Sequence, residues 1–581
     1  MNYVNINHCW GTLIIEELSR LGVDYFCVAP GSRSSPLVIA VAQNKKVKSF
    51  VHFDERGLAF HAMGYCAAAK KPAVLICTSG TAGANFFPAV IEASKKKLPM
   101  IVITADRPPE LRQTGAVQTI DQVGLFGKYA QWAADMSCPD INIDPRYVLT
   151  TIDQAWYQAL RHHGVVHINC MFRQPLTLLQ TSDDLKSYTK PLKTWEQAQG
   201  PYTDYINGSD SAVLDVPEKF VARLEAIKNG LIVVGKIAGD EEARLVLKLS
   251  EKLGWPVFAD IASGLRLGQK HPHLIHYFDH QLSSEKILKE LTFDGVLHLG
   301  GRMTSSRYYD FIQKQNPSEY IMVQNHALRN DPNHQVTLRV ESGVSHFIQA
   351  TIAFIKPRKS SKVLKVLSKV EKIADKLIES FFAQDEGLSE PRVSRLVSQL
   401  IPEFHGLFLS NSMPIRDMAN YGDFKGHQVF VNGNRGSSGI DGIIASAAGY
   451  ARGLDRPVTL MIGDLAALHD LNSLAMLRDL PVPLVIVLLN NGGGGIFSFL
   501  PIADFKECFE KFWGTPHSYT LASAASMFEL NYCQPSDASH FKKVYAQALK
   551  SQTSTIIEVI TNREENLNLH RSLQDSINKN I

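Results

Sequence analysis

Short apolar segments alternate with helix-forming segments along almost the whole chain. In the first third, the apolar segments occupy residues 24–28, 73–78, 99–104 and 165–169. Strands that are apolar on both faces are typical of parallel sheets, whose connecting helices cover both faces. The alternation returns at residues 231–234, 257–260, 295–299 and 320–323, and again at 407–409, 458–462, 484–489 and 555–559. The pattern predicts an α/β fold with mainly parallel sheets, in three consecutive domains.

Two interruptions of this alternation divide the chain. Between residues 181 and 210 polar residues, proline and glycine replace most apolar residues, as in a surface linker. Between residues 363 and 381 apolar residues recur with helical spacing, which predicts a helix that connects two domains. We therefore expect three α/β domains and a connecting helix, which occupy in chain order residues 1–185, 205–357, 361–385 (the helix) and 388–581.

Charge and apolar run lengths limit the partners and the location of the protein. The 581 residues carry a formal net charge of +3, so we expect no nucleic-acid partner. The longest apolar runs have eight or nine residues, whereas a membrane-spanning helix needs about 20. The first residues do not resemble a secretory signal, and the eight cysteines suit a reducing compartment. We expect a cytoplasmic protein without a membrane span.

A motif in the last third predicts a metal site. Asp464 directly follows one apolar segment, and Asn491 follows the next, with 24 residues between the triplet Gly463-Asp464-Leu465 and the pair Asn490-Asn491. In a parallel sheet both side chains reach the same edge. Carboxylate and amide oxygens, with a carbonyl from the glycine-rich turn that follows, are ligands that Mg²⁺ prefers. The spacing resembles the cofactor motif of thiamine-diphosphate enzymes; the alternative is that the glycines only form a tight loop.

Polar loops follow the predicted strands of the first domain. They include PGSRSSP, HFDERG, TSGTAG and TADRPPE, which contain Ser32, Arg33, Glu55 and Arg107. Because these loops follow parallel strands, we expect the four side chains to converge on one crevice. Thiamine-diphosphate enzymes place a glutamate against the aminopyrimidine ring of the cofactor, and Glu55 has the corresponding position after a strand. The alternative is that Glu55 only stabilises the first turn of a helix.

Eight segments in order resemble one family within this class. They are PGSRSSP, HFDERG, TSGTA, TADRPPE, GAVQTID, NRGSSGIDG, GDLAALHDLN and NNGGGGIFS. Together they resemble the menaquinone-pathway synthases that make 2-succinyl-5-enolpyruvyl-6-hydroxy-3-cyclohexene-1-carboxylate (SEPHCHC). The match runs from the first predicted strand to beyond Phe499 and is weak only in the middle domain.

The resemblance implies a cofactor and an assembly. It implies a pyrimidine-binding domain, a central domain and a diphosphate-binding domain, in chain order. It also implies that the protein binds thiamine diphosphate together with Mg²⁺ or Mn²⁺. A homodimer or homotetramer would share each active site between two chains. The implied metal ligands are Asp464, Asn491 and the Gly493 carbonyl, and Glu55 is the implied catalytic group. The remaining implied cofactor contacts are Ile440, Ile496 and Phe497.

The substrates implied by the family are 2-oxoglutarate and isochorismate. The implied transferase reaction decarboxylates 2-oxoglutarate and joins the remaining unit to isochorismate by 1,4-addition, which yields SEPHCHC and CO₂. The two substrates bring four carboxylates, for which planar guanidinium groups are well suited. The implied substrate-binding residues are Arg33, Arg107, Ser412, Arg416 and Arg435, and Ser32 and Gln118 are implied in catalysis beside Glu55, Arg33 and Arg107. A surface ion pair is the alternative for any one arginine.

Three positions depart from the family pattern. Ser306 stands where many relatives have a lysine, and Arg302 or Arg307 is a candidate replacement. Ala466 removes a hydroxyl near the expected diphosphate, where a backbone N–H at a helix start can serve instead. Gly492 replaces a third asparagine, which we expect to change the loop shape more than metal binding.

Three other functions remain as alternatives. One is another thiamine-diphosphate enzyme, such as an acetohydroxyacid synthase or a simple 2-oxoacid decarboxylase, for which four pocket arginines are unexpected. A second is a non-catalytic homologue that binds the cofactor or a metabolite. A third is a nicotinamide-dependent dehydrogenase, but the sequence lacks a GxGxxG loop, so we expect no nicotinamide or flavin.

Overall fold

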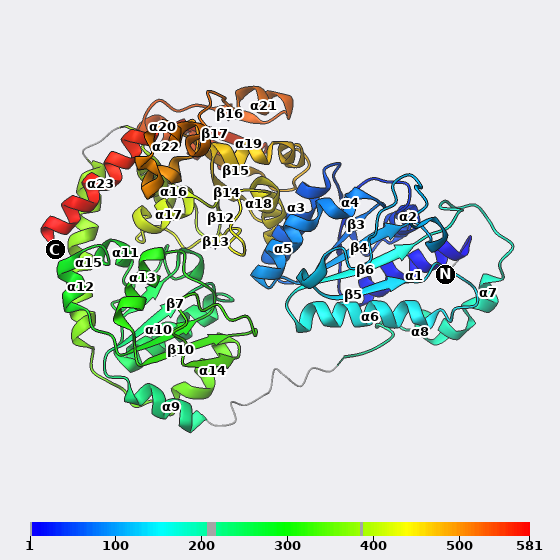
Figure 1. Ribbon diagram of the computed structural model, residues 1–581, viewed down its shortest axis with the longest axis horizontal. Helices are drawn as coiled ribbons and strands as arrows, with labels where there is room; N and C mark the ends of the chain where they lie inside the picture. Colours follow the sequence, from blue (N-terminus) through cyan, green and yellow to red (C-terminus); the bar gives the residue numbers. More distant parts are fainter. Residues whose placement is uncertain (1–2, 206–216, 384–386) are drawn as a thin grey trace. The chain divides into compact units, whose positions relative to one another are not determined.

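The computed structural model describes residues 3–205, 217–383 and 387–581. It contains two compact units, which we call the amino-terminal unit (Met1–Asn207, Asn434–Arg456 and Leu468–Leu484) and the carboxyl-terminal unit (Gly208–Gly433, Pro457–Ala467 and Val485–Ile581). Figure 1 labels the elements of both units. No helix within the described ranges combines the length and the apolar character needed to cross a membrane.

The amino-terminal unit contains a six-stranded sheet in the order β2-β1-β3-β4-β6-β5, in which every paired strand is parallel. Its strands are β1 (Tyr25–Val28), β2 (Lys48–Val51), β3 (Ala73–Cys77), β4 (Met100–Asp106), β5 (Ala130–Met136) and β6 (Val165–Met171). Its helices are α1 (Ile6–Arg20), α2 (Ser35–Gln43), α3 (Glu55–Ala69), α4 (Thr81–Asn85), α5 (Phe87–Lys96), α6 (Arg146–Arg161), α7 (Leu185–Tyr188), α8 (Lys193–Gln197) and α18 (Ile443–Leu454).

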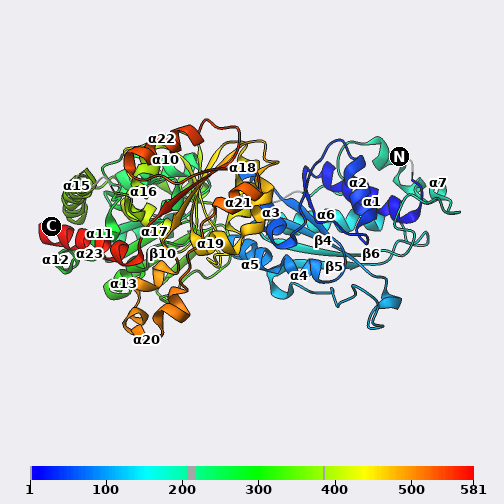
Figure 2. The same ribbon diagram turned by 90° about the horizontal axis from the view of Figure 1, so that it is seen from above.

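Helices cover both faces of this first sheet. Helices α1, α2 and α6 share one apolar core with the sheet, and α3 and α5 share the other. Helix α18 packs along α3, as Figure 2 also shows. At Gly64 of α3 an added Cβ would lie 2.1 Å from the carbonyl oxygen of Ser446, so glycine allows these two helices to approach closely.

The carboxyl-terminal unit contains two further parallel sheets. The first has the order β11-β10-β9-β7-β8. Its strands are β7 (Gly230–Val234), β8 (Val257–Ala259), β9 (Gly295–Leu299), β10 (Glu319–Gln324) and β11 (Leu338–Glu341). The helices around it are α9 (Pro217–Ala226), α10 (Asp240–Leu253), α11 (Phe278–Gln281), α12 (Glu285–Glu290), α13 (Ser306–Gln315), α14 (Val344–Ile352) and α15 (Lys362–Ala383).

The other sheet of this unit has the order β13-β12-β14-β15-β17-β16. Its strands are β12 (Gly406–Leu409), β13 (Phe430–Asn432), β14 (Val458–Gly463), β15 (Leu484–Asn490), β16 (Asn531–Cys533) and β17 (Thr555–Ile560). The helices are α16 (Glu390–Leu400), α17 (Met413–Tyr421), α19 (Asp464–His469), α20 (Lys506–Phe509), α21 (Ala522–Met527), α22 (Ala538–Ala548) and α23 (Arg563–Asn580).

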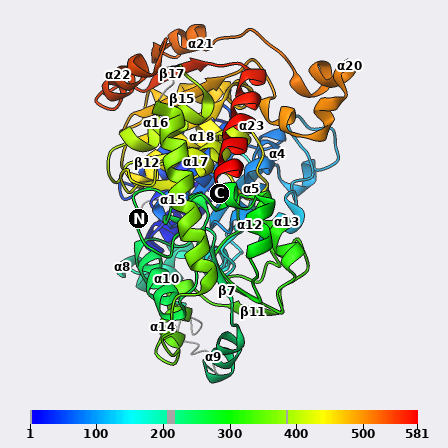
Figure 3. The same ribbon diagram turned by 90° about the vertical axis from the view of Figure 1, so that its left-hand side faces the viewer.

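The structure confirms the predicted fold class, with three parallel α/β sheets, and the predicted helix at residues 363–381, which is α15. Figure 3 shows α15 beside α23, whose buried residues Leu573 and Ile577 join the same core. The exact domain boundaries stay a prediction.

One sequence interpretation is wrong. Part of the polar segment at 181–210 is not a surface linker, because residues 185–188 and 193–197 form α7 and α8, with a 3-10 turn at 190–192 between them. Their apolar side chains belong to the first core, and the Trp195 indole donates a hydrogen bond of 2.6 Å to the buried Glu17 carboxylate. Four apolar residues of this segment, Leu185, Tyr188, Leu192 and Trp195, join this core, which a low average hydropathy conceals. Residues 206–210 lie outside the described ranges.

Candidate active site

Asp464 lies at the carboxyl end of β14, one of the two central strands of its sheet, where α19 begins. Its side chain is only 2% exposed. Oδ1 accepts the backbone N–H of Leu465 at 2.7 Å, and Oδ2 accepts that of Gly493 at 2.9 Å. Hydrogen bonds from two backbone groups hold the carboxylate in one orientation.

The turn after β15 brings the other predicted metal ligands to Asp464. Gly493 has a φ of +150°, and an added Cβ would lie 2.2 Å from the carbonyl oxygen of Gly514, so no other residue fits there. Two residues earlier, Asn491 donates from Nδ2 to Oε1 of Glu390 at 2.8 Å. The structure therefore gathers Asp464, Asn491 and Gly493 at one edge of the sheet, as expected from their spacing.

Burial of this cluster raises the pKa values of its acidic side chains. Desolvation raises the pKa of Asp464 above its usual value, although the two backbone donors oppose the shift. Burial, and the nearby Asp417, also raise the pKa of Glu390. His517 lies with Nε2 3.3 Å from Asp464 Oδ2. A buried acid with a raised pKa is stabilised in its charged form when a cation is added beside it.

The donor atoms of this cluster fit a hard divalent cation. Among the described residues, the side-chain oxygen of Asn491 is buried and accepts no hydrogen bond. The Gly493 carbonyl accepts one, from the Gly495 amide at 3.0 Å, and keeps a second lone pair. A carboxylate, an amide oxygen and a backbone carbonyl form the kind of all-oxygen set that Mg²⁺ takes when phosphates and water supply its other ligands.

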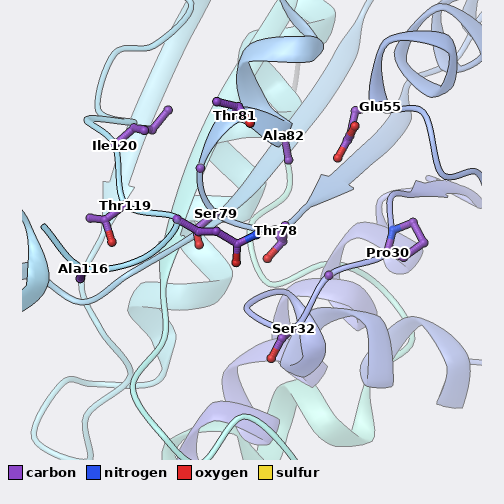
Figure 4. Close-up of a pocket in the computed structure, with 13 residues that line it drawn as sticks. Pro30, Ser32, Glu55, Thr78, Ser79, Thr81, Ala82, Ala116, Thr119 and Ile120 are labelled. Carbon is purple, nitrogen blue, oxygen red and sulfur yellow. The ribbon is translucent and has the colours of Figure 1, made fainter.

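The amino-terminal unit contains a cavity of about 400 Å³ at the ends of β1 and β3. Glu55, Ser32 and Gln118 all line it, together with Thr78 and Ser79. Figure 4 shows Glu55 on the first turn of α3, with Thr78 and Ser32 bordering the same space. Asp54 caps this helix by accepting the backbone N–H groups of residues 56 and 57, which leaves the Glu55 side chain out of the cap.

Arg33 and Arg107 are not among the residues that line this cavity, although the Arg33 backbone N–H donates to the hydroxyl of Thr78, which does line it, at 3.2 Å. The expected convergence of these two side chains stays a prediction. Arg33 is 7% exposed and donates from Nη1 to the carbonyl oxygen of Phe172 at 2.7 Å. Burial and the neighbouring Arg107 lower the pKa of Arg33. In the described residues the Nε atoms of both arginines are buried without a hydrogen-bond partner. A loop position directs the backbone to the sheet edge, but the long side chain turns toward the nearest buried carbonyl.

A second cavity, of about 560 Å³, lies in the carboxyl-terminal unit. Arg416, Ile496 and Arg307 line it. Arg416 donates from Nη1 to the Ser412 carbonyl at 2.5 Å, and burial lowers its pKa. Arg307 pairs with Asp279 at 3.3 Å. Of the two candidate replacements for the lysine expected at Ser306, the structure places Arg307 at this cavity.

Three further predicted residues lie on a short helix and on a loop. Phe497 belongs to the same short helix as Ile496, at residues 495–499, but does not line the second cavity. Arg435 and Ile440 flank a loop in the amino-terminal unit, whose backbone N–H groups at residues 436–438 donate to the buried Glu92 carboxylate at 2.6 to 3.3 Å. Ile440 is 37% exposed. Glu92 therefore holds the loop that presents both residues.

Sequence reasoning missed the buried acids around the metal cluster. Glu390 contacts Asn491, and Asp417 lies 3.2 Å from Nε2 of His570. Glu390 lies in none of the segments that carry the resemblance, and Asp417 directly follows Arg416 but was assigned no role. The only signal from Glu390 is its position at the start of an amphipathic helix, where an acidic residue is also expected simply because it stabilises the first turn.

Comparisons with known proteins agree with this geometry. Solved structures of a benzoylformate decarboxylase from Polynucleobacter necessarius and a thiamine diphosphate-dependent 4-hydroxybenzoylformate decarboxylase from Rhodococcus jostii RHA1 share the fold. Their TM-scores are 0.72 and 0.71, at 15% and 17% identity over 95% of this chain and 98% and 99% of theirs. Family models for the N-terminal TPP binding domain, the middle domain and the C-terminal TPP binding domain of thiamine pyrophosphate enzymes match residues 10–125, 186–409 and 415–559. The fold and the site define a thiamine-diphosphate-dependent enzyme.

Relatives of similar length show to which family of thiamine-diphosphate-dependent enzymes the chain belongs. Proteins named 2-succinyl-5-enolpyruvyl-6-hydroxy-3-cyclohexene-1-carboxylate synthase from Rubrobacter xylanophilus, Prosthecochloris aestuarii and Salinibacter ruber are 44%, 41% and 40% identical to this chain. The alignments cover 98 to 99% of this chain and 98% of each relative. The chain belongs to this family of SEPHCHC synthases.

Proposed function

We propose that this protein decarboxylates 2-oxoglutarate and adds the remaining four-carbon unit to isochorismate by 1,4-addition, which forms SEPHCHC and CO₂ in menaquinone biosynthesis. The observation that carries the proposal is the similarity to SEPHCHC synthases along almost the entire chain, at 44% identity to one of them. The domain boundaries proposed with it are residues 1–185, 205–357 and 388–581, with the connecting helix at 361–385.

The proposal assigns roles to the residues of the two cavities and the metal cluster. Asp464, Asn491 and Gly493 would hold Mg²⁺, or Mn²⁺ in its place, and through it the cofactor diphosphate. Bound thiamine diphosphate supplies the nucleophilic carbon and the electron sink for decarboxylation. Glu55 would exchange a proton with the aminopyrimidine ring, for which its carboxylate at the cavity wall is available. The proposed cofactor contacts also include Ile440, Ile496 and Phe497.

Guanidinium and hydroxyl groups would orient the substrates. Arg416 at the second cavity and Arg435 beside its loop offer planar donors for carboxylates, as do Arg33 and Arg107, whose unpartnered Nε atoms provide spare donors. Arg307, also at the second cavity, would take the place of the lysine absent at Ser306. The proposed polar contacts are Ser32, Gln118 and Ser412.

The test is an assay of the purified protein with thiamine diphosphate, Mg²⁺, 2-oxoglutarate and isochorismate, with products identified by mass. We expect SEPHCHC and one CO₂ for each 2-oxoglutarate consumed. Replacing 2-oxoglutarate by pyruvate serves as the control and should give little CO₂, because pyruvate lacks the second carboxylate and leaves its arginine partner unpaired. Decarboxylation of pyruvate in preference to 2-oxoglutarate would instead support another thiamine-diphosphate enzyme.

We also propose a homodimer or homotetramer in which Glu55 of one subunit and Asp464 of its partner serve the same active site. Mixing two inactive variants, Glu55→Gln and Asp464→Asn, tests this arrangement. After random exchange, half of the dimers are mixed and each mixed dimer holds one intact site, so roughly a quarter of the full activity should return. No recovery after demonstrated exchange would place both residues of a site on one chain.

The proposed location is the cytoplasm. Each of the eight cysteines is a free thiol, and six of them are buried. Such thiols persist in reducing compartments. Fractionation of cells with an antibody to the protein would test the location.

A further inference from the structure

Asn490, the last residue of β15, and Asn491, which follows it, each donate to a different buried glutamate. Asn490 donates from Nδ2 to Oε1 of Glu558 at 2.6 Å, and Asn491 donates from Nδ2 to Oε1 of Glu390 at 2.8 Å. Glu558 is fully buried and Glu390 is 1% exposed. Burying two carboxylates is costly unless their hydrogen bonds are satisfied, so their positions call for an explanation.

The two asparagines differ in what their oxygens do. Asn490 Oδ1 accepts the backbone N–H of Gly492 at 3.1 Å, and its Nδ2 also donates to the Tyr519 carbonyl at 2.9 Å. Both N–H groups of this amide and one lone pair of its oxygen thus have partners. Among the described residues, Asn491 Oδ1 is buried and accepts nothing. Of the two amide oxygens, Asn491 Oδ1 is therefore the one with both lone pairs available to a ligand.

Glu390 determines which end of the Asn491 amide faces that ligand. The same Glu390 oxygen, Oε1, also accepts the hydroxyl of Thr561 at 3.2 Å. An oxygen that accepts two donors acts as an acceptor whether or not the other carboxyl oxygen carries a proton. It therefore selects the NH₂ end of Asn491, and the amide oxygen points the opposite way.

We propose that Glu390 is a positioning residue that keeps the oxygen of Asn491, rather than its NH₂ group, directed toward the divalent cation. This inference rests on the proposed function, since the metal role of Asn491 is part of it. Without the acceptor at Glu390 the amide can rotate by 180° and present two N–H donors, which repel a cation. Partners that orient a metal ligand typically change metal affinity about 10- to 100-fold when removed.

The test measures metal binding rather than turnover. The full chain is titrated with Mn²⁺ in the presence of thiamine diphosphate, and free Mn²⁺ is followed by electron paramagnetic resonance. Glu390→Met removes the acceptor and should weaken Mn²⁺ binding at least tenfold. Glu390→Gln keeps an acceptor oxygen and should restore binding to within about threefold of the unaltered chain. Thr561→Val, the matched control, removes the other donor to Glu390 and should leave Mn²⁺ binding within the same range.

Two measurements keep the outcome decisive. If circular dichroism shows that Glu390→Met does not fold, Glu390→Asp replaces it, because the shorter side chain withdraws the acceptor while the charge remains, and a fivefold loss is expected. A folded Met or Asp variant that binds Mn²⁺ like the unaltered chain overturns the proposal, as does an unaltered chain that binds none. Mn²⁺ binding that follows this pattern in a chain that makes no SEPHCHC would reject the proposed function and leave the role of Glu390 standing.

Discussion

The proposed catalytic glutamate and the proposed metal ligands are supported in opposite ways. In the carboxyl-terminal unit, Asp464 is held by two backbone donors and Asn491 by a buried glutamate. In the amino-terminal unit, Glu55 lies at a cavity wall, and no group in the described residues donates a hydrogen bond to its carboxylate. Metal ligands must be held before the metal arrives, whereas a proton-transfer group must keep its hydrogen-bonding capacity for the ligand.

The largest expected effect separates these two roles. Glu55→Gln should lower the rate of 2-oxoglutarate decarboxylation about 10³-fold, because the amide cannot exchange the proton. Mn²⁺ binding in the presence of thiamine diphosphate should stay unchanged, since no metal ligand is altered. Stopped-flow measurement of CO₂ release, beside the Mn²⁺ titration, checks both statements. Normal turnover in this variant would make Glu55 only a helix-start carboxylate.

Asp464→Asn should produce the converse result. The amide brings no charge to the metal, and its NH₂ group must face one of the two backbone N–H donors, at Leu465 or Gly493. We expect the affinity for Mg²⁺ to fall several hundred-fold, on the order of the loss of a charged oxygen ligand. Isothermal titration with Mg²⁺ in the presence of thiamine diphosphate gives the affinity. Unchanged affinity would exclude Asp464 as a ligand.

The amino-terminal unit also contains a buried acid, Asp470, whose carboxylate is held by several hydrogen bonds, as that of Asp464 is. Asp470 accepts the Ala445 N–H at 3.0 Å and the Ser473 hydroxyl at 2.8 Å, with Arg56 4.0 Å away. Burial raises its pKa from 3.8 to about 6. The folded state therefore keeps this proton longer than the unfolded chain, so stability falls as pH rises from about 4 to about 6.

Above pH 6 the free energy of unfolding is lower by about 3 kcal/mol than below pH 4, at 1.36 kcal/mol per pKa unit, because Asp470 is then charged in the folded state. Asp470→Asn should abolish this part of the pH dependence, because the amide carries no charge. Hydrogen exchange of the Ala445 amide, at the start of α18, between pH 4 and pH 7 reports it locally after correction for the intrinsic exchange rate. The same pH slope in the variant would assign the shift to another group.

The smallest expected effect concerns the second cavity. Arg416→Lys should raise the apparent KM about tenfold for the substrate whose carboxylate it binds, because an ammonium group cannot form the paired hydrogen bonds of a guanidinium. Decarboxylation of bound 2-oxoglutarate should change little. Initial rates with each substrate varied in turn identify the carboxylate. Equal KM values would make Arg416 a structural residue that holds the Ser412 carbonyl.

The strands that the sequence revealed and those that it did not reveal differ in their burial. All twelve apolar segments correspond to strands, including β3, β4 and β6, which are buried along their entire length. The five missed strands, β2, β5, β11, β13 and β16, all lie at sheet edges, and most of their residues are exposed or half-buried. An edge strand with an exposed open side lacks a continuous apolar run, whereas β8, also at a sheet edge, is buried along its length and was predicted.

The candidate site divides along a similar line. Motif spacing was enough to bring Asp464, Asn491 and Gly493 together, because each lies at the end of a strand in the same sheet. It did not specify the direction of the long Arg33 side chain, which turns to the Phe172 carbonyl. A side chain with several rotatable bonds follows its nearest hydrogen-bond acceptor, which the local sequence does not specify.

The sequence by itself determined the class of fold, the central strands and the strand ends where the chemistry is expected. The reason is that buried strands appear as apolar runs, and the residues directly after each run mark the strand end. Only the tertiary structure decided which buried acids support those groups. Glu390 lies 101 residues from Asn491, and Glu92 lies 344 residues from the loop at Gly436 that it holds. The local sequence around a glutamate does not show whether its carboxylate is exposed to solvent or accepts hydrogen bonds from a distant segment, because that partner is brought near only when the chain folds.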